Sequence, residues 1–143
     1  AVEALRAATV LEKAGISAEV IDIRTVKPLD YGKIIESVKK TGRLLVTDLG
    51  YYSGGLAGDV VARVSEEAFD SMSVAPRRIT SPDIPTPSTP ALAKHYYPRQ
   101  IDIIKTACEM VEKHDKAKWL LEEEKRKEPK HLDVPDPSFT GPF

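Results

Sequence analysis

Glycines gather at one turn of the sequence, where Gly54, Gly55 and Gly58 lie between a predicted strand and a predicted helix. Backbone amides at the start of a helix attract anions, so this turn is a candidate phosphate-binding site. Its spacing differs from the G-x-G-x-x-G dinucleotide pattern, and no Lys-Ser or Lys-Thr pair follows it. We therefore favour a tight turn with close helix packing over a phosphate site.

Aromatic and histidine side chains stand near this turn in the sequence. Tyr51 and Tyr52 directly precede it, and we expect them to be partly buried, with an interface or a ligand wall as the alternative. His95 follows a proline-rich segment, where a surface histidine is favoured over one that faces a shared cleft. The histidines lack metal-ligand spacing, and no nucleophile and base can be paired. We assign no catalytic, cofactor-binding or metal-binding residue.

Acidic residues follow the glycine turn. Asp59, Glu66, Glu67 and Asp70 fall on or just after the predicted helix. A solvated helix face is the expected arrangement. The alternative is a docking patch for a basic partner domain, because charges of this kind speed and orient the encounter of two proteins.

The elements that position these residues alternate between helix and strand. Apolar residues recur at every third position from Val2 to Ala14 and predict a helix that Gly15 ends. The spacing of the strands leaves room for helical crossovers, so the sequence predicts an α/β domain with a parallel sheet flanked by helices. The other predicted elements are a strand at Ala18–Ile23, a helix capped by Asp30 and ended by Thr41-Gly42, a strand at Leu44–Val46, a helix from Gly54-Gly55 to Ala68, an edge strand at Arg77–Thr80, and a last helix whose inner face holds Ile101, Ile104, Ala107, Cys108 and Val111.

Composition excludes several classes of function. The 143 residues include 21 basic and 22 acidic ones, for a net charge of -1, so we expect no nucleic acid partner. We also expect no membrane partner, because no run approaches the roughly 18 apolar residues that span a bilayer. The single cysteine, Cys108, excludes an internal disulfide and fits a reducing compartment. A helix at the first residue has neither a cap nor an earlier partner, so we expect the chain to be a fragment.

Six segments in combination resemble a known family. They are residues 18–30 (AEVIDIRTVKPLD), residues 36–46 (ESVKKTGRLLV), Gly54-Gly55, residues 67–69 (EAF), Ala75-Pro76 and residues 82–87 (PDIPTP). Together they resemble the C-terminal domain of the beta subunit of 2-oxoacid dehydrogenase first components, of the pyruvate and branched-chain type. The same domain type closes transketolases.

The resemblance covers residues 1–112 and implies a domain organisation. It implies a three-layer α/β/α domain with a mostly parallel sheet, from which the family's first strand is missing. Residues 113–143 then form a charged and proline-rich C-terminal extension. Its Phe139 and Phe143 gain little when left in water, so we expect them to pack against a partner.

The resemblance also implies a role in assembly. The domain forms a beta–beta dimer within an alpha-two beta-two tetramer and helps to dock the basic subunit-binding domain of the lipoyl acyltransferase. The full enzyme decarboxylates a 2-oxoacid and transfers the acyl group to lipoamide. Its thiamine diphosphate and magnesium bind outside this chain. The enzyme is expected in bacterial cytoplasm or in the mitochondrial matrix. The alternatives are a free-standing phosphate-binding regulatory module and the C-terminal domain of a transketolase-like sugar-phosphate enzyme.

Overall fold

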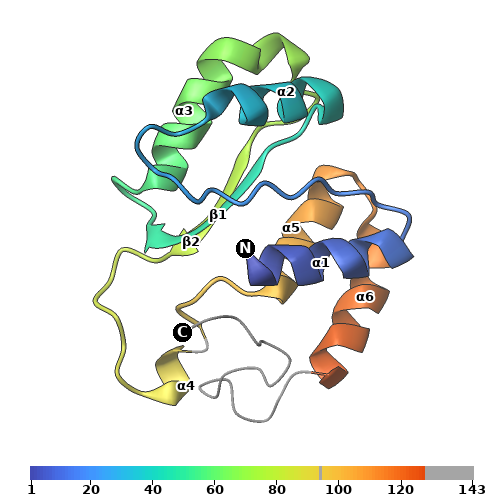
Figure 1. The fold of residues 1–143 in the computed structure, drawn as a ribbon. Helices are drawn as coiled ribbons and strands as arrows, with labels where there is room; N and C mark the ends of the chain where they lie inside the picture. Colours follow the sequence, from blue (N-terminus) through green and yellow to red (C-terminus); the bar gives the residue numbers. More distant parts are fainter. Residues whose placement is uncertain (94, 128–143) are drawn as a thin grey trace.

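The computed structural model describes residues 1–93 and 95–127 (Figure 1). Two helices open the chain, β1 and β2 follow with a helix between them, and three helices come after β2. In chain order the elements are α1 (Val2–Lys13), α2 (Tyr31–Thr41), β1 (Leu45–Tyr51), α3 (Leu56–Ala68), the 3-10 helix η1 (Phe69–Ser71), β2 (Arg77–Ser81), α4 (Pro90–Ala93), α5 (Gln100–Met110) and α6 (His114–Lys127).

The two strands pair in parallel. Leu45 lies opposite Arg77 and Thr47 lies opposite Ile79, and the register shifts between Thr47 and Tyr51. The backbone N–H of Arg77 donates to the carbonyl of Leu44 at 3.0 Å, at the start of the pair. Parallel strands need a crossover, and α3 provides it. The predicted strands at 44–46 and 77–80 are therefore confirmed, the first one extended to Tyr51.

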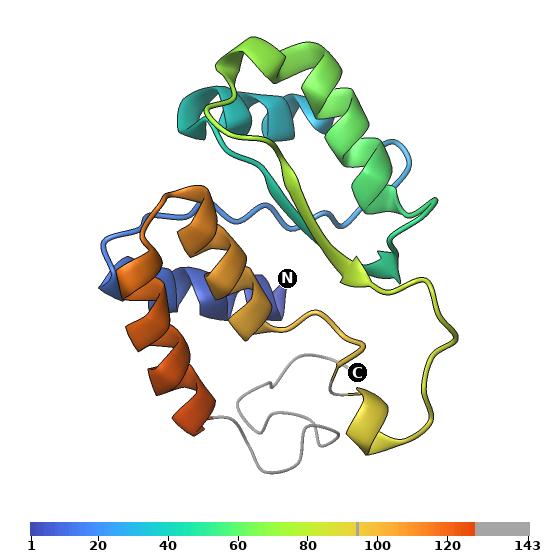
Figure 2. The same ribbon diagram turned by 180° about the vertical axis from the view of Figure 1, so that it is seen from behind.

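Helices cover both faces of the strand pair. Figures 1 and 2 show α2 and α3 on one side and α1, α5 and α6 on the other. One buried cluster centres on Val38 of α2 and Val64 of α3, while the other joins Leu11 of α1 to Ile104 of α5 and Leu120 of α6. The fold is thus an α/β sandwich of three layers, as predicted.

Local signals in the sequence set the helix ends. The carboxylate of Asp30 accepts from the backbone N–H of Lys33 at 3.3 Å and caps α2. Gly42 ends the same helix with φ +68°, and its N–H donates to the carbonyl of Val38. Gly15 takes the same left-handed conformation after α1. These three predictions are confirmed.

The predicted strand at Ala18–Ile23 does not form. This segment runs as irregular chain, and within the described residues no backbone hydrogen bond joins residues 17–28 to another element. A strand requires a neighbour on at least one side, and a groove separates this segment from β1. The prediction was wrong because its β-branched pattern specifies an extended conformation but supplies no pairing partner.

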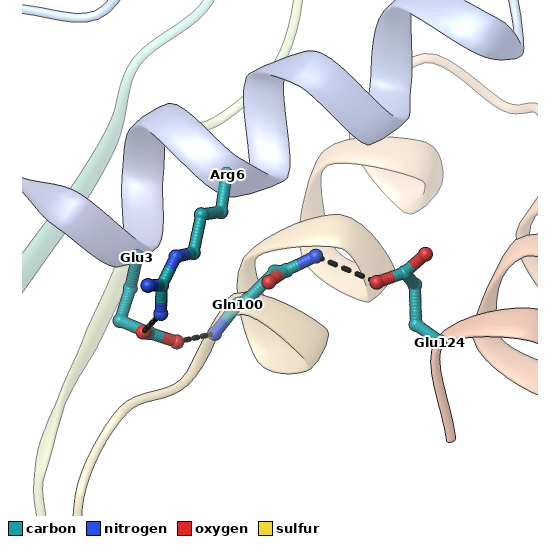
Figure 3. Close-up of polar contacts among 4 residues, drawn as sticks. All are labelled: Glu3, Arg6, Gln100 and Glu124. Atoms are coloured by element: carbon teal, nitrogen blue, oxygen red, sulfur yellow. Dashed lines mark hydrogen bonds and ion pairs between the residues drawn. The ribbon is translucent and has the colours of Figure 1, made fainter. Parts of the chain in front are cut away.

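The helix α6 packs against α5 as part of the core. Leu120 is fully buried there, whereas the neighbouring Trp119 remains 55% exposed. A polar chain also links three helices (Figure 3): Glu3 of α1 accepts from the backbone N–H of Gln100 at 2.7 Å, and the Gln100 side-chain amide donates to Glu124 of α6 at 2.9 Å. The guanidinium of Arg6, on the same helix, donates to the carboxylate of Glu3 at 3.3 Å. A carboxylate at the first residue of α5 also complements the dipole of that helix.

Truncating Leu120 tests whether α6 belongs to the folding unit. We expect Leu120→Ala to lower the free energy of unfolding by about 2–5 kcal/mol, because it leaves a cavity among fully buried side chains. The matched control is Leu5→Ala, whose side chain is 55% exposed and which should change stability by less than about 1 kcal/mol. Urea unfolding followed by circular dichroism measures both. Equal, small effects would show that α6 is not part of the cooperative core.

Candidate interface at the carboxyl ends of the strands

The two strands end at the same edge of the sheet, where two loops meet. We call the surface formed by Tyr51, Tyr52, Ser53, Arg78 and Asp83 the carboxyl-end surface. The side chains of Tyr51 and Tyr52 are 48% and 52% exposed. About half of the surface of each residue therefore remains open. In open α/β sheets, this edge is where ligands and partners usually bind.

Two contacts tie the loops together. The backbone N–H and the hydroxyl of Ser53 donate to the two carboxylate oxygens of Asp83, at 3.0 and 2.6 Å. The Arg78 guanidinium lies over the ring of Tyr52, 4.0 Å from its centroid, and donates to the Tyr52 carbonyl at 3.0 Å. The contact between Ser53 and Asp83 joins the loop after β1 to the loop after β2. The contact between Arg78 and Tyr52 joins the loop after β1 to β2 itself. These contacts give the surface a defined shape.

The carboxylate of Asp83 occupies the place where an anion would bind. The hydrogen bonds from Ser53 and the nearby Arg78 hold the pKa of Asp83 below its usual value. Asp59 adds a second carboxylate in the first turn of α3. A phosphate at this turn would meet two negative charges, and the Ser53 amide is already engaged. The residues of the turn therefore do not fit a phosphate group.

The glycines serve the geometry of the turn. Gly54 has φ +68°, a conformation that other residues rarely adopt. A Cβ atom at Gly55 would lie 2.3 Å from the carbonyl oxygen of Tyr51. At Gly58 a Cβ atom would lie 3.1 Å from the Arg78 guanidinium, so α3 approaches that side chain closely. The predicted tight turn therefore requires glycine at position 54 for its positive φ and at position 55 for lack of space.

The segment after β2 joins the same surface through Tyr96. This side chain is buried, and its hydroxyl accepts from Thr86 at 3.3 Å. Hydrogen bonding to the Tyr96 side chain raises the pKa of Tyr51. His95 is exposed on the turn before Tyr96, as expected of a surface histidine.

The acidic residues do not form one cluster. Glu66 and Glu67 are exposed at the carboxyl end of α3 and Asp70 is exposed in η1, while Asp59 lies near the start of α3, roughly 10–12 Å from Glu66 and Glu67 at 1.5 Å per residue. Asp59 accepts a hydrogen bond from Tyr31. Arg63 pairs with Glu67. Phe69, 71% exposed, stands among the acidic residues at the far end.

Catalytic and metal-binding groups do not emerge from the part of the chain that the structure describes. Cys108 is buried in the core, and burial raises the pKa of its thiol. No group of three or more His, Cys, Asp or Glu in that part could hold a metal ion. Phe139 and Phe143 lie outside the described residues.

Sequence analysis did not single out Arg78, Asp83, Ser53 or Tyr96 for the carboxyl-end surface. Asp83 carries a usable signal, because an acidic residue just beyond a strand of a parallel sheet must lie at the carboxyl edge. Its partner Ser53 carries none, since thirty residues separate the two. The contact exists only once β1 and β2 pair.

The family follows from comparison with known proteins. Residues 1–103 match the family described as "Transketolase, C-terminal domain". The chain belongs to this family. The match contains α1, both strands and the turn between β1 and α3, so the carboxyl-end surface belongs to the shared domain.

Relatives of the transketolase C-terminal family include dehydrogenase subunits. The chain is 44% identical over 101 residues to the "Pyruvate dehydrogenase E1 component subunit beta" of Rickettsia bellii, which covers 71% of this chain and 31% of the relative. It is 42% identical over 110 residues to the subunit of the same name from Bacillus subtilis, which covers 77% and 34%. The beta subunit of an acetoin:2,6-dichlorophenolindophenol oxidoreductase from Cupriavidus necator is 38% identical over 104 residues, covering 73% and 31%. The chain spans about a third of the length of these relatives.

Further relatives come from bacteria and from organisms whose protein is named mitochondrial, such as pea. None of the described helices is both long and apolar enough to cross a membrane.

Substitution of two glycines by alanine separates crowding from helix propensity. We expect Gly55→Ala to destabilise the domain by about 1–3 kcal/mol, because the new Cβ collides with backbone at Tyr51. Gly58→Ala is the control: it meets only the flexible end of Arg78 and gains helix propensity, so its stability should be unchanged or slightly higher. Thermal and urea unfolding measure both. A Gly55 variant as stable as the Gly58 variant would contradict the geometry of the turn.

The carboxyl titration of Asp83 reports the contact between the loops. We expect its pKa to lie below the ordinary value of 3.8 and to rise in Ser53→Ala, which removes the hydroxyl donor. Because the pKa in the folded state is lowered, the contact stabilises the loops above pH 3.8 and is lost as pH falls through the folded pKa. Carbon NMR of the carboxyl group measures this. An unchanged pKa of Asp83 in Ser53→Ala would contradict it.

Proposed function

We propose that this chain is the assembly domain of the beta subunit of a thiamine diphosphate-dependent 2-oxoacid dehydrogenase first component. The observation that carries the proposal is the 44% identity to a pyruvate dehydrogenase beta subunit, over a stretch as long as the matched domain. The full enzyme would decarboxylate a 2-oxoacid and pass the acyl group to lipoamide. This domain would take no chemical step by itself.

The cofactors belong elsewhere in the full enzyme. Asp59, in the first turn of α3, and Asp83, after β2, lie beside the turn before α3, so this turn does not suit a diphosphate. The family resemblance implies that thiamine diphosphate and magnesium bind to residues outside this chain. The domain would act by holding the subunits that frame that site.

The surface chemistry supports a role in assembly. Exposed apolar side chains border the carboxyl-end surface, with Leu49 66% and Ile84 55% exposed beside the half-open tyrosines. Apolar groups at this density mark sites that a partner covers. We propose that these side chains, Gly54-Gly55 and His95 lie in or near contacts with a second beta subunit or with the alpha subunit.

A second surface suits a basic partner. Glu66, Asp70 and the exposed Phe69 combine negative charge with one aromatic anchor at the carboxyl end of α3. We propose that this end of α3 attracts the basic subunit-binding domain of the lipoyl acyltransferase, with the charges acting mainly on the rate of association.

The proposal includes a domain division and a compartment. Residues 1–112 would form the family domain, and residues 113–143 an extension whose Phe139 and Phe143 contact a neighbouring subunit. The enzyme would work in bacterial cytoplasm or in the mitochondrial matrix, since one relative is bacterial and another, from pea, is named mitochondrial. The phosphate-module alternative is disfavoured by the two carboxylates at the turn. A sugar-phosphate enzyme of the transketolase type is disfavoured by the dehydrogenase names of the relatives.

Purification of the polypeptide that contains this chain, from its source cells, tests the proposal. We expect a polypeptide a little more than twice as long as this chain, since relatives have that length, together with an alpha subunit in equal amount and a lipoyl acyltransferase. Mass spectrometry identifies all three. A polypeptide no longer than this chain, purified without partners, would contradict the proposal.

Charge reversal in the same complex tests the docking surface. We expect Glu66→Lys combined with Asp70→Lys to slow association with the acyltransferase about tenfold at low salt, and less at high salt. Glu12→Lys, an exposed charge on α1 in the other helical layer, is the control and should leave the rate unchanged. Stopped-flow mixing measures the rates. Equal effects of both variants would assign the docking to another surface.

A further inference from the structure

One face of α6 packs against the domain and fixes the orientation of this helix. Leu120 is fully buried among side chains of α1 and α5. The carboxylate of Glu124 accepts from the side-chain amide of Gln100 at 2.9 Å (Figure 3). Leu120 and Glu124 are four positions apart, so they lie on the same side of the helix. A turn of the helix about its axis would break both contacts, so the opposite face points away from the domain.

A row of four exposed residues runs along that opposite face. Its members are Asp115, Trp119, Glu122 and Arg126, and we call them the α6 stripe. The steps between them are four, three and four residues, which is the spacing that keeps side chains in line where two helices pair. Trp119 is 55% exposed in the middle of the stripe. A large aromatic side chain in this position is typical of the anchor of a protein contact.

The α6 stripe is complementary to itself when two copies run antiparallel. A two-fold axis midway between Trp119 and Glu122 places Asp115 of one helix opposite Arg126 of the other, and the pair contains this contact twice. The same axis places Trp119 opposite Glu122, where the indole N–H can donate to the carboxylate. In a parallel pair, by contrast, each charged residue of the stripe would face its own copy, and like charges repel.

The place of α6 in the chain makes such a contact additional to those of the shared domain. Residues 1–103 match the family, whereas α6 begins at His114. Figures 1 and 2 show α6 in the helical layer opposite to α3. A contact through the α6 stripe therefore leaves the acidic end of α3 open to another partner.

We propose that α6 pairs antiparallel with α6 of a second copy of this chain, through the α6 stripe. Ion pairs between Asp115 and Arg126 close both ends of the contact, and Trp119 of each copy packs against Glu122 of the other in the middle. The tryptophans supply the apolar area, and the charges set the antiparallel direction.

Carbodiimide cross-linking in the full polypeptide that contains this chain tests the pairing, because this reagent joins a carboxylate to an amine that touches it. In Arg126→Lys, we expect the amine at position 126 to form an amide bond with the carboxylate of Asp115. Mass spectrometry of the linked peptides identifies the two positions. They are about 16 Å apart along one helix at 1.5 Å per residue, so this link forms only between copies.

Second substitutions added to Arg126→Lys show what the link depends on. Trp119→Ala should lower the yield of the link at least about fivefold, because the contact loses its apolar anchor. Lys125→Ala is the matched control: it removes an exposed side chain that lies beside the stripe, and the yield should not change. In a separate variant that exchanges the charges, Asp115→Lys with Arg126→Asp, a link should form again between the same two positions.

Three results would overturn the proposal. Absence of a link between positions 115 and 126 would show that copies do not pair through α6. A link from position 126 to a different polypeptide, in place of Asp115, would assign the stripe to another partner. Equal yields with Trp119→Ala and Lys125→Ala would show that the link reports chance collisions. None of these readouts depends on the enzymatic assignment, so the two proposals can fail separately.

Discussion

Parallel pairing of β1 with β2 is the constraint on which the other features of this domain depend. Parallel strands cannot be joined by a tight turn, so the chain between them must cross back over one face of the sheet, and α3 does so. The same pairing brings both strand ends to one edge, where Ser53 meets Asp83. It also engages only one edge of β1, which leaves the groove on the other.

Two separate cores hold this arrangement. The cluster between α2 and α3 and the cluster among α1, α5 and α6 lie on opposite sides of the strands, and side chains of β1 reach into both. Small side chains on α1 and α5, such as Ala8 and Ala107, keep the space beside β1 open where larger residues would fill it. The space along the free edge of β1 is therefore not filled by side chains of the described residues.

The chemistry of the carboxyl edge points toward recognition between proteins. The start of α3 could attract an anion, but Asp83 takes the hydrogen-bond donors of the preceding loop, and Arg78 is engaged by Tyr52. The polar groups of this surface bond to one another, so the exposed groups that remain for a partner are its apolar side chains. Such a surface gains free energy when a partner covers it and offers no group poised to transfer a proton or an electron pair.

The sequence by itself determined the local features: the caps at Asp30, Gly42 and Gly15, the apolar faces of the helices and the positions of the two strands. These depend on residues within a few positions of one another, whose conformational preferences act wherever the segment lies. Only the tertiary structure decided that residues 18–23 lack a partner, that Ser53 meets Asp83, and that Leu120 joins the core. Each of these outcomes depends on which distant segments meet, and pairing and burial in space are not encoded in the periodicity of any one segment.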